Sequence, residues 1–263
     1  MLAAALAFVA GLLIGSFLNV CIYRLPRDLS VARPGRSFCP ACEKTIAWYD
    51  NIPVVSYFVL GGRCRYCQAR ISYRYPVVEL GTGLLWFYWV YMYGATPLAA
   101  KFCVLSALIV GLIFSDLEER ILPDEMTVGG AVMGLAFAWF VPVIDTPLSQ
   151  LMGVEAAGLR SFVYAAFSAV TPAFFLWGAG YLYQKVRKRE GLGFGDVKLI
   201  AMVGAFLGLQ NSLFTLIVGS IAGSVIGYGY IKLRGKDTST YELPFGTFLG
   251  LAALAAAFLS DKV

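Results

Sequence analysis

Long apolar runs constrain the fold of this chain more than any other feature. An apolar run of about 20 residues crosses a bilayer core about 30 Å thick as a helix. Candidate spans fall near residues 2–23, 76–93, 98–115, 126–144, 161–184, 196–209, 212–231 and 243–260. Only 14% of the residues are charged and 59% are hydrophobic, whereas an ordinary soluble domain carries roughly 25% charged residues. The sequence therefore predicts an all-α polytopic membrane protein with about eight transmembrane helices.

The basic residues divide unevenly between the two sides of this predicted path. Of the 21 Lys and Arg residues, nine fall in 23–75, one is Arg120, five fall in 185–198 and three in 232–236. These four connections share one side, and only Lys101, Arg160 and Lys262 lie opposite. The positive-inside rule assigns the basic side to the cytoplasm. We therefore expect the N-terminus outside, the connection 24–75 in the cytoplasm, and no role for the net charge in nucleic-acid binding.

Two cysteine pairs lie in the connection 24–75, which has about 50 residues and is too small to build a deep core without a cross-link. The pairs are CPAC at 39–42 and CRYC at 64–67, with 21 residues between them. In a reducing cytoplasm, four thiolates at this spacing suit a tetrahedral zinc ion better than disulfides. The alternatives are redox-active dithiols or unrelated thiols. We expect Cys39, Cys42, Cys64 and Cys67 to hold a structural zinc.

These features predict three parts of the chain. Residues 1–23 form a first transmembrane helix, which carries no charge and is not preceded by the basic segment of a signal peptide. Residues 24–75 form a small zinc-stapled cytoplasmic loop domain, and residues 76–263 form a seven-helix membrane core.

Three carboxylates lie within or at the ends of predicted spans, where charges are costly and tend to mark function: Glu79, Asp116 and Asp196. Asp116 closes the third span and Asp196 opens the sixth, so both face the cytoplasm and can meet. Two carboxyl groups held close together share a proton, and such a pair can activate a water while protonating a leaving group. The chain has no histidine, so this pair is the most economical hydrolytic machinery open to it.

Glycines surround Asp196 in the segment GFGD. Gly193 and Gly195 allow close backbone approaches, against which an extended peptide substrate could lie. The apolar run from 197 to 209 would be only about 20 Å long as a helix, so we expect the loop that carries Asp196 to dip into the membrane. Lys198 either stabilises the ionised form of Asp196 or extends its charge to the headgroups.

Other interpretations of the carboxylates remain open at this point. Asp116 and Asp196 could be interfacial charges that end helices at the headgroups, or a proton relay in a transporter. The chain lacks the paired broken spans that would support a transporter. Glu79 is either a partner of the dipole at the N-terminus of its helix or a site residue.

Several segments of the chain resemble the bacterial type IV prepilin peptidases, also called leader peptidase/N-methyltransferases. Besides the cysteine pairs, they are GSFLNVCIYRLP (15–26), NIPVVSYFVLGGRCRYC (51–67), ISYRYPVVELGTG (71–83), DLEERILPD (116–124), GFGDVKL (193–199) and LPFGTFLG (243–250). The resemblance covers nearly the whole chain in the family's order, and it is more specific than GxGD alone.

The resemblance implies an aspartic protease at the cytoplasmic face of the bacterial inner membrane. Such enzymes remove the short basic leader from prepilins and from the pseudopilins of type II secretion. The family's catalytic aspartates correspond to Asp116 and Asp196, and Asp124 ends the motif that contains Asp116. Long members also methylate the new N-terminus with S-adenosylmethionine, and the cysteine loop marks this chain as one of them.

The residues that bind S-adenosylmethionine are not identified, because nothing in 24–75 resembles a nucleotide-binding glycine loop. The alternatives are a peptidase without methyltransferase activity and a presenilin-like intramembrane protease, which shares GxGD but cuts within the apolar helix. The expected partners are prepilin or pseudopilin substrates and the lipid bilayer, and the oligomeric state is left open.

Overall fold

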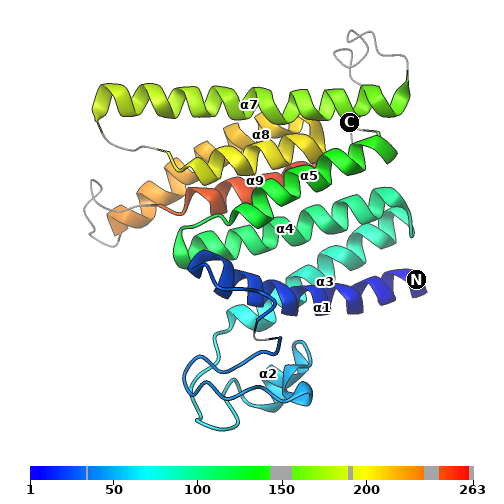
Figure 1. The fold of residues 1–263 in the computed structure, drawn as a ribbon, viewed down its shortest axis with the longest axis vertical. Coiled ribbons are helices and arrows are strands. Elements are labelled where there is room, and N and C mark those ends of the chain that lie inside the picture. The colour runs from blue at the N-terminus through cyan, green and yellow to red at the C-terminus, as the bar shows by residue number, and fades with distance from the viewer. Residues whose placement is uncertain (34, 143–155, 189–191, 234–242, 261–263) are drawn as a thin grey trace. The chain divides into compact units, whose positions relative to one another are not determined.

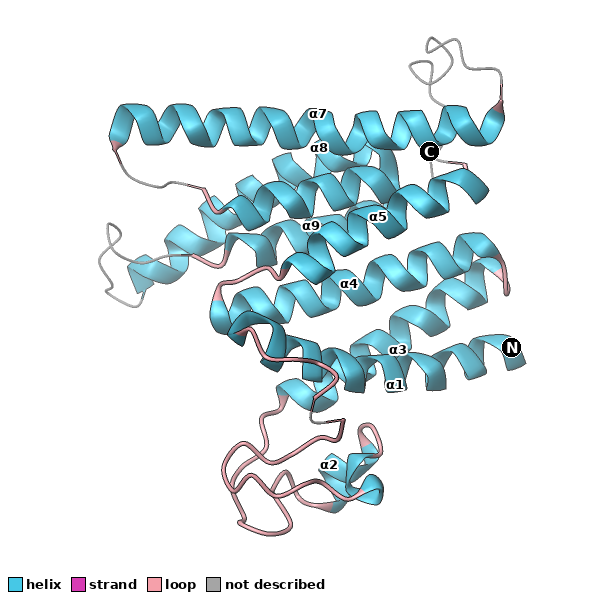
Figure 2. Cartoon of the chain, viewed as in Figure 1, coloured by secondary structure: helices cyan, strands magenta, loops and turns pink. Residues whose placement is uncertain are grey.

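The computed structural model describes the whole chain except residues 34, 143–155, 189–191, 234–242 and 261–263. The described residues are mainly helical and contain no named strand (Figure 2), and their β pairing is limited to two isolated bridges. The chain divides into two compact units, Met1–Phe114 and Ser115–Val263. Arg189, Arg234, Lys236 and Lys262, which the charge count included, lie outside the described residues, as do residues 143–144 of the fourth predicted span.

The first unit contains two long helices that pack closely, α1 (Leu2–Arg24) and α3 (Arg74–Tyr93). The approach depends on small residues, because a β-carbon on Gly15 would lie 2.6 Å from the Cα of Glu79. Glycines at helix interfaces allow such backbone approaches in membrane proteins. Between these helices the chain forms short helical turns at Leu25–Arg27 and Trp48–Asn51, and the short helix α2 (Val55–Val59).

Helix α4 (Pro97–Glu119) begins in the first unit and ends in the second. In the first unit its N-terminal half contacts α3. The indole N–H of Trp86 donates to the carbonyl oxygen of Cys103 at 2.9 Å, and the rings of Trp89 and Phe102 stack with centroids 4.6 Å apart. These aromatic contacts hold the two helices together.

The second unit is built around α8 (Phe194–Leu233), which packs against α5 (Asp124–Phe140), α7 (Ala157–Arg187) and α9 (Phe245–Leu259) (Figure 1). The first half of α8 is almost fully buried among these neighbours. A β-carbon on Gly204 would overlap the backbone of Ser168 in α7. The start of α8 is therefore fixed by the packing of the helices around it.

The predicted spans 196–209 and 212–231 form the single element α8, which is interrupted at Gly208. There φ is 83° and ψ is 176°, a conformation that glycine adopts readily and other residues do not. The interruption lies one residue before the predicted end of the sixth span. Only glycine allows the chain to leave and re-enter the helix at this point.

Described helices lie at each of the predicted span positions, and the all-α membrane class is confirmed. Four of the described helices are long and apolar enough to cross a membrane: Leu2–Arg27, Pro97–Glu119, Ala157–Arg187 and Phe194–Gly227. Helix α9 is apolar but shorter. The count of eight transmembrane helices and the boundaries of the three predicted parts stay predictions.

Candidate active site and cysteine cluster

Asp116 lies near the C-terminal end of α4, where it is 5% exposed. The helix ends three residues later at Glu119, because the next residue, Arg120, adopts a left-handed φ of 55°. The hydroxyl of Ser115 then donates to the carbonyl oxygen of Ile121 at 2.7 Å, which fixes the turn that follows.

Thr247, near the start of α9, holds the carboxyl group of Asp116 in place. Oδ2 of Asp116 accepts hydrogen bonds from the backbone N–H of Thr247 at 2.6 Å and from its hydroxyl at 2.9 Å. Two donors from one residue therefore hold this carboxyl oxygen in place.

Asp196 lies in the first turn of α8 and is 7% exposed. Its carboxyl group is close enough to that of Asp116 to interact with it electrostatically. The two side chains come from helices α4 and α8, and both belong to the second unit. The two aspartates singled out in the sequence thus share one buried environment.

Leu122 fills the space beside the two carboxyl groups. A β-carbon on Gly195 would lie 3.0 Å from the Cβ of Leu122, and one on Gly246 would lie 2.9 Å from its Cδ1. The β-carbon on Gly246 would also lie 3.2 Å from the Cγ of Asp116. Gly195 and Gly246 therefore leave room for Leu122 and Asp116 at positions where alanine would crowd them.

Gly193 is exposed and lies beside the other aspartate. A β-carbon there would lie 3.2 Å from Oδ2 of Asp196 and would have no other close neighbour. The carbonyl oxygen of Gly193 accepts the backbone N–H of Asp196 at 3.1 Å. A side chain at position 193 would therefore crowd the carboxyl group of Asp196.

Lys198 and Asp124 pair with each other near the start of α8. Nζ of Lys198 lies 2.5 Å from Oδ1 of Asp124 and 4.8 Å from the ring centroid of Phe194. The pair is partly exposed and joins the first residue of α5 to the fifth residue of α8. Lys198 is therefore engaged with Asp124 in this structure.

Glu79 belongs to the first unit, where it is 7% exposed in α3. Its Oε2 accepts the backbone N–H of Val54 at 2.7 Å, and its carboxyl group also hydrogen bonds with Ser16. Val54 has a φ of 63°, which is unusual for a β-branched residue. Glu79 therefore fastens the loop before α2 to α1 and α3.

The four cysteine sulfurs converge in the first unit. The Sγ atoms of Cys39, Cys42, Cys64 and Cys67 all lie within 4.8 Å of one another, and the cluster could hold a metal ion. The backbone N–H groups of Cys67 and Tyr66 hydrogen bond to the Cys64 thiol and lower its pKa to about 7. Thiolate, the form that binds metals, is therefore accessible at Cys64 near neutral pH.

The two cysteine pairs adopt the same local fold. In each, the residue after the second cysteine has a positive φ, 58° at Glu43 and 60° at Gln68, and its N–H donates to the carbonyl of the first cysteine. An isolated antiparallel bridge closes each turn, between Phe38 and Thr45 and between Arg63 and Arg70. These paired turns direct the cysteines of both motifs to one point.

Sequence reasoning missed the side chains that surround the aspartates. Thr247 and Gly246 lie in the segment LPFGTFLG, whose sequence indicates only the family resemblance. A threonine within an apolar run is a signal of a buried polar partner. The packing of Leu122 left no sequence signal, because it depends on how α4, α8 and α9 approach one another.

Comparisons with known proteins match both halves of the chain. Residues 9–93 match the bacterial peptidase A24 N-terminal domain, and residues 102–228 match the type IV leader peptidase family. No solved structure matches the chain.

Three relatives share the name prepilin leader peptidase/N-methyltransferase. The one from Myxococcus xanthus is 44% identical over 233 residues, which cover 89% of this chain and 64% of the relative. The one from Pseudomonas putida is 33% identical over 282 residues, covering 98% and 91%. The one from Aeromonas hydrophila is 35% identical over 287 residues, covering 98% and 91%. The similarity spans both units, and the chain therefore belongs to the type IV leader peptidase family.

Proposed function

We propose that this chain is a membrane aspartic endopeptidase that removes the basic leader from type IV prepilins and type II secretion pseudopilins, and that it then methylates the new N-terminus. The name of its relatives supports both activities. The observation that carries the peptidase half is the shared buried environment of Asp116 and Asp196, which α4 and α8 bring together.

In the proposed reaction Asp116 and Asp196 share one proton. One carboxylate accepts a proton from a water molecule as its oxygen attacks the carbonyl carbon of the scissile bond. The other carboxyl group donates a proton to the nitrogen that leaves when the peptide bond breaks. Thr247 orients Asp116, and the exposed Gly193 leaves an extended substrate room to approach Asp196.

We also propose supporting roles for the other residues singled out in the sequence. Gly195 makes room for Leu122 beside the carboxyl groups. The pair of Lys198 and Asp124 holds the first turn of α8, two residues from Asp196. Glu79 acts in the first unit, where it fixes the loop at Val54.

The proposed site lies at the cytoplasmic face of the bacterial inner membrane. The supporting observation is the position of both aspartates at helix ends on the basic side of the sequence. In this topology eight spans place the N-terminus outside and the cysteine loop in the cytoplasm. The apolar part of a pilin enters the bilayer, and its basic leader stays in the cytoplasm beside the site.

The peptidase half is tested by incubating the purified full chain with a prepilin and following leader loss by mass spectrometry. We expect Asp116→Asn and Asp196→Asn each to lower the cleavage rate by roughly 10²–10⁴-fold or more. Glu125→Gln is the matched control, because Glu125 is an exposed carboxylate in the first turn of α5. Wild-type cleavage by either aspartate variant would remove that residue from the mechanism. A cut within the apolar helix would instead indicate an intramembrane protease.

We further propose that the cysteine cluster holds a structural zinc. Four thiolates about 2.3 Å from a tetrahedral zinc lie about 3.8 Å apart, and the Sγ atoms of Cys39 and Cys67 are 3.8 Å apart. With protein sulfur at all four positions, the ion would have no open site for a substrate or a catalytic water.

The zinc proposal is tested by measuring the metal content of the purified chain. We expect about one zinc per wild-type chain, a loss of zinc in Cys64→Ser, and full zinc in Cys103→Ser. Cys103 is a buried free cysteine in α4 outside the cluster, so it controls for the loss of a thiol. A wild-type protein that contains no zinc would contradict the proposal.

A further inference from the structure

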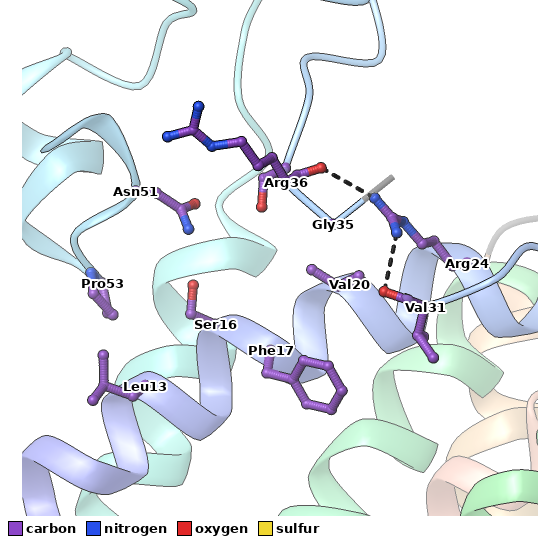
Figure 3. Close-up of a pocket in the computed structure, with 11 residues that line it drawn as sticks. Leu13, Ser16, Phe17, Val20, Arg24, Val31, Gly35, Arg36, Asn51 and Pro53 are labelled. Carbon is purple, nitrogen blue, oxygen red and sulfur yellow. Dashed lines mark hydrogen bonds between the residues drawn. The ribbon is translucent and has the colours of Figure 1, made fainter. Parts of the chain in front are cut away.

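A pocket of about 300 Å³ lies beside the C-terminal half of α1, within the first unit (Figure 3). Its floor is one face of α1, formed by side chains three or four positions apart, among them Leu13, Phe17 and Val20. Its walls come from Val31 and residues 35–37 on one side and from Asn51 and Pro53 on the other. The volume is at the lower end of the roughly 300–1,000 Å³ typical of small-molecule sites.

The walls supply two polar side chains that have no hydrogen-bond partner among the described residues. The side chains of Arg36 and Asn51 both line the pocket (Figure 3), and neither forms a hydrogen bond or an ion pair with any other described residue. Ser16, which hydrogen bonds with Glu79, and Ser37 also line it. An apolar floor with a few convergent polar groups is the usual composition of a binding site for a small organic ligand.

A buried arginine fixes the shape of the wall that contains Val31 and Arg36. Arg24 is 4% exposed and donates hydrogen bonds to the carbonyl oxygens of Ser30 at 3.0 Å, Val31 at 3.1 Å and Arg36 at 3.3 Å. The last two of these bonds can be followed in Figure 3. Because a buried guanidinium must keep its partners, this part of the loop is held in one curvature against α1.

Both walls of the pocket adjoin the two cysteine turns. Arg36 and Ser37 immediately precede the first cysteine turn, where the N–H of Ile46 donates to the carbonyl of Ser37 at 2.9 Å. On the other side, Asp50 forms two hydrogen bonds with Arg65 of the second cysteine turn, at 2.7 and 2.6 Å. Asn51 follows Asp50 directly. The pocket is therefore assembled from α1 and from the segments that the two cysteine turns position.

We propose that this pocket binds S-adenosylmethionine, an inference that rests on the methyltransferase half of the proposed function. Arg36 suits the carboxylate of the methionine part, because guanidinium pairs well with carboxylate. Asn51 and Ser37 suit the ribose hydroxyls and the amino group. Phe17 and Val20 suit the face of the adenine ring.

The pocket fits this compact ligand better than it fits a phospholipid. Its polar groups are an amide and hydroxyls as well as a cation, and its volume of about 300 Å³ leaves no room for two acyl chains. In this proposal the open side of the pocket leaves the methyl group of the ligand accessible, as its transfer to a protein N-terminus requires.

The test measures binding of S-adenosylhomocysteine, which cannot transfer a methyl group, to the purified full chain by isothermal titration calorimetry. We expect Arg36→Glu to weaken binding by about tenfold or more. Val20→Phe should weaken it similarly, because the larger ring fills the floor without changing the charge. Arg33→Glu is the matched control and should bind as the wild type does, since Arg33 is exposed in the same loop but does not line the pocket.

Zinc content and the melting temperature establish that each variant is folded. Wild-type affinity in both Arg36→Glu and Val20→Phe would overturn the proposal. So would a phospholipid found by native mass spectrometry on the wild type and lost from Val20→Phe, with the affinity for S-adenosylhomocysteine unchanged. If the wild type methylates a cleaved pilin while the variants bind normally, only the pocket is wrong. If the wild type cleaves but neither methylates nor binds, the methyltransferase half of the proposed function is wrong.

Discussion

The hydroxyl of Thr247 tests the proposed active site while leaving both aspartates in place. Thr247→Val keeps the shape of the side chain and removes the donor that lies 2.9 Å from Oδ2 of Asp116. The backbone N–H of residue 247 still donates to the same oxygen from 2.6 Å. The substitution therefore deletes one of two bonds that fix the carboxyl group.

The size of the effect follows from the energy of that bond. A hydrogen bond to a charged group contributes about 1.5–3 kcal/mol, and about 1.4 kcal/mol corresponds to a tenfold change in rate. Complete loss of this hydrogen bond in the transition state would slow cleavage by roughly 10- to 150-fold. Because the backbone donor remains, we expect the lower end of this range, about a tenfold decrease.

The assay is leader cleavage over a range of prepilin concentrations, so that kcat and KM are obtained separately. Thr247 acts through Asp116, so we expect kcat to fall while KM stays within about twofold. Thr247→Ser keeps the donor and should stay within about threefold of the wild-type kcat. An unchanged kcat in Thr247→Val would refute the reasoning, and so would equal losses in the valine and serine variants.

Three glycines give further predictions, one for leader cleavage and two for stability. In Gly246→Ala the new β-carbon would lie 2.9 Å from the Cδ1 of Leu122, so we expect slower leader cleavage, and partial recovery when Leu122→Ala is added; a double variant as slow as the single one would count against the crowding. Gly15→Ala would place its β-carbon 2.6 Å from the Cα of Glu79, and we expect a lower melting temperature, with a cost of about 1–3 kcal/mol. Gly81→Ala meets no atom within 4 Å and should leave the melting temperature unchanged or raise it, because alanine favours a helix by about 1 kcal/mol; equal melting temperatures for these two alanine variants would contradict the packing argument.

Helix positions and the proximity of the two aspartates could be predicted from sequence for simple physical reasons. Apolar runs mark helices because a bilayer tolerates few other backbone conformations. Each span reverses the direction of the chain, so the end of the third span and the start of the sixth fall on the same side. That parity suggested that Asp116 and Asp196 could meet, and in the structure they interact.

The partners of these residues could not be predicted in the same way. Thr247 lies 131 positions from Asp116, and the hydrogen bond between them depends on the rotation of α9 about its own axis. Lys198 is two residues from Asp196 in sequence, yet its cation pairs with Asp124. Neighbours along a helix point in different directions, whereas contacts between helices depend on rotation and depth that hydropathy does not encode.

The cysteine loop shows the same limit on a smaller scale. The spacing of the pairs indicated a four-sulfur cluster, and the Sγ atoms do converge. The spacing did not reveal the ion pair between Arg65 in the second cysteine turn and Asp50, which directly precedes Asn51. Such an ion pair depends on the path of the chain between the two turns, which contains no regular periodicity.

The two proposed sites are held in place by different interactions. The pocket assigned to the methyl donor depends on a short loop that has little core of its own, and metal–thiolate bonds can supply the missing rigidity. The aspartates depend on α8, whose first half is buried among α5, α7 and α9. The residues that position each site belong to separate units of the chain. In this scheme the proposed zinc would support the pocket through the cysteine turns, whereas the carboxyl groups take their positions from helix packing and from Thr247.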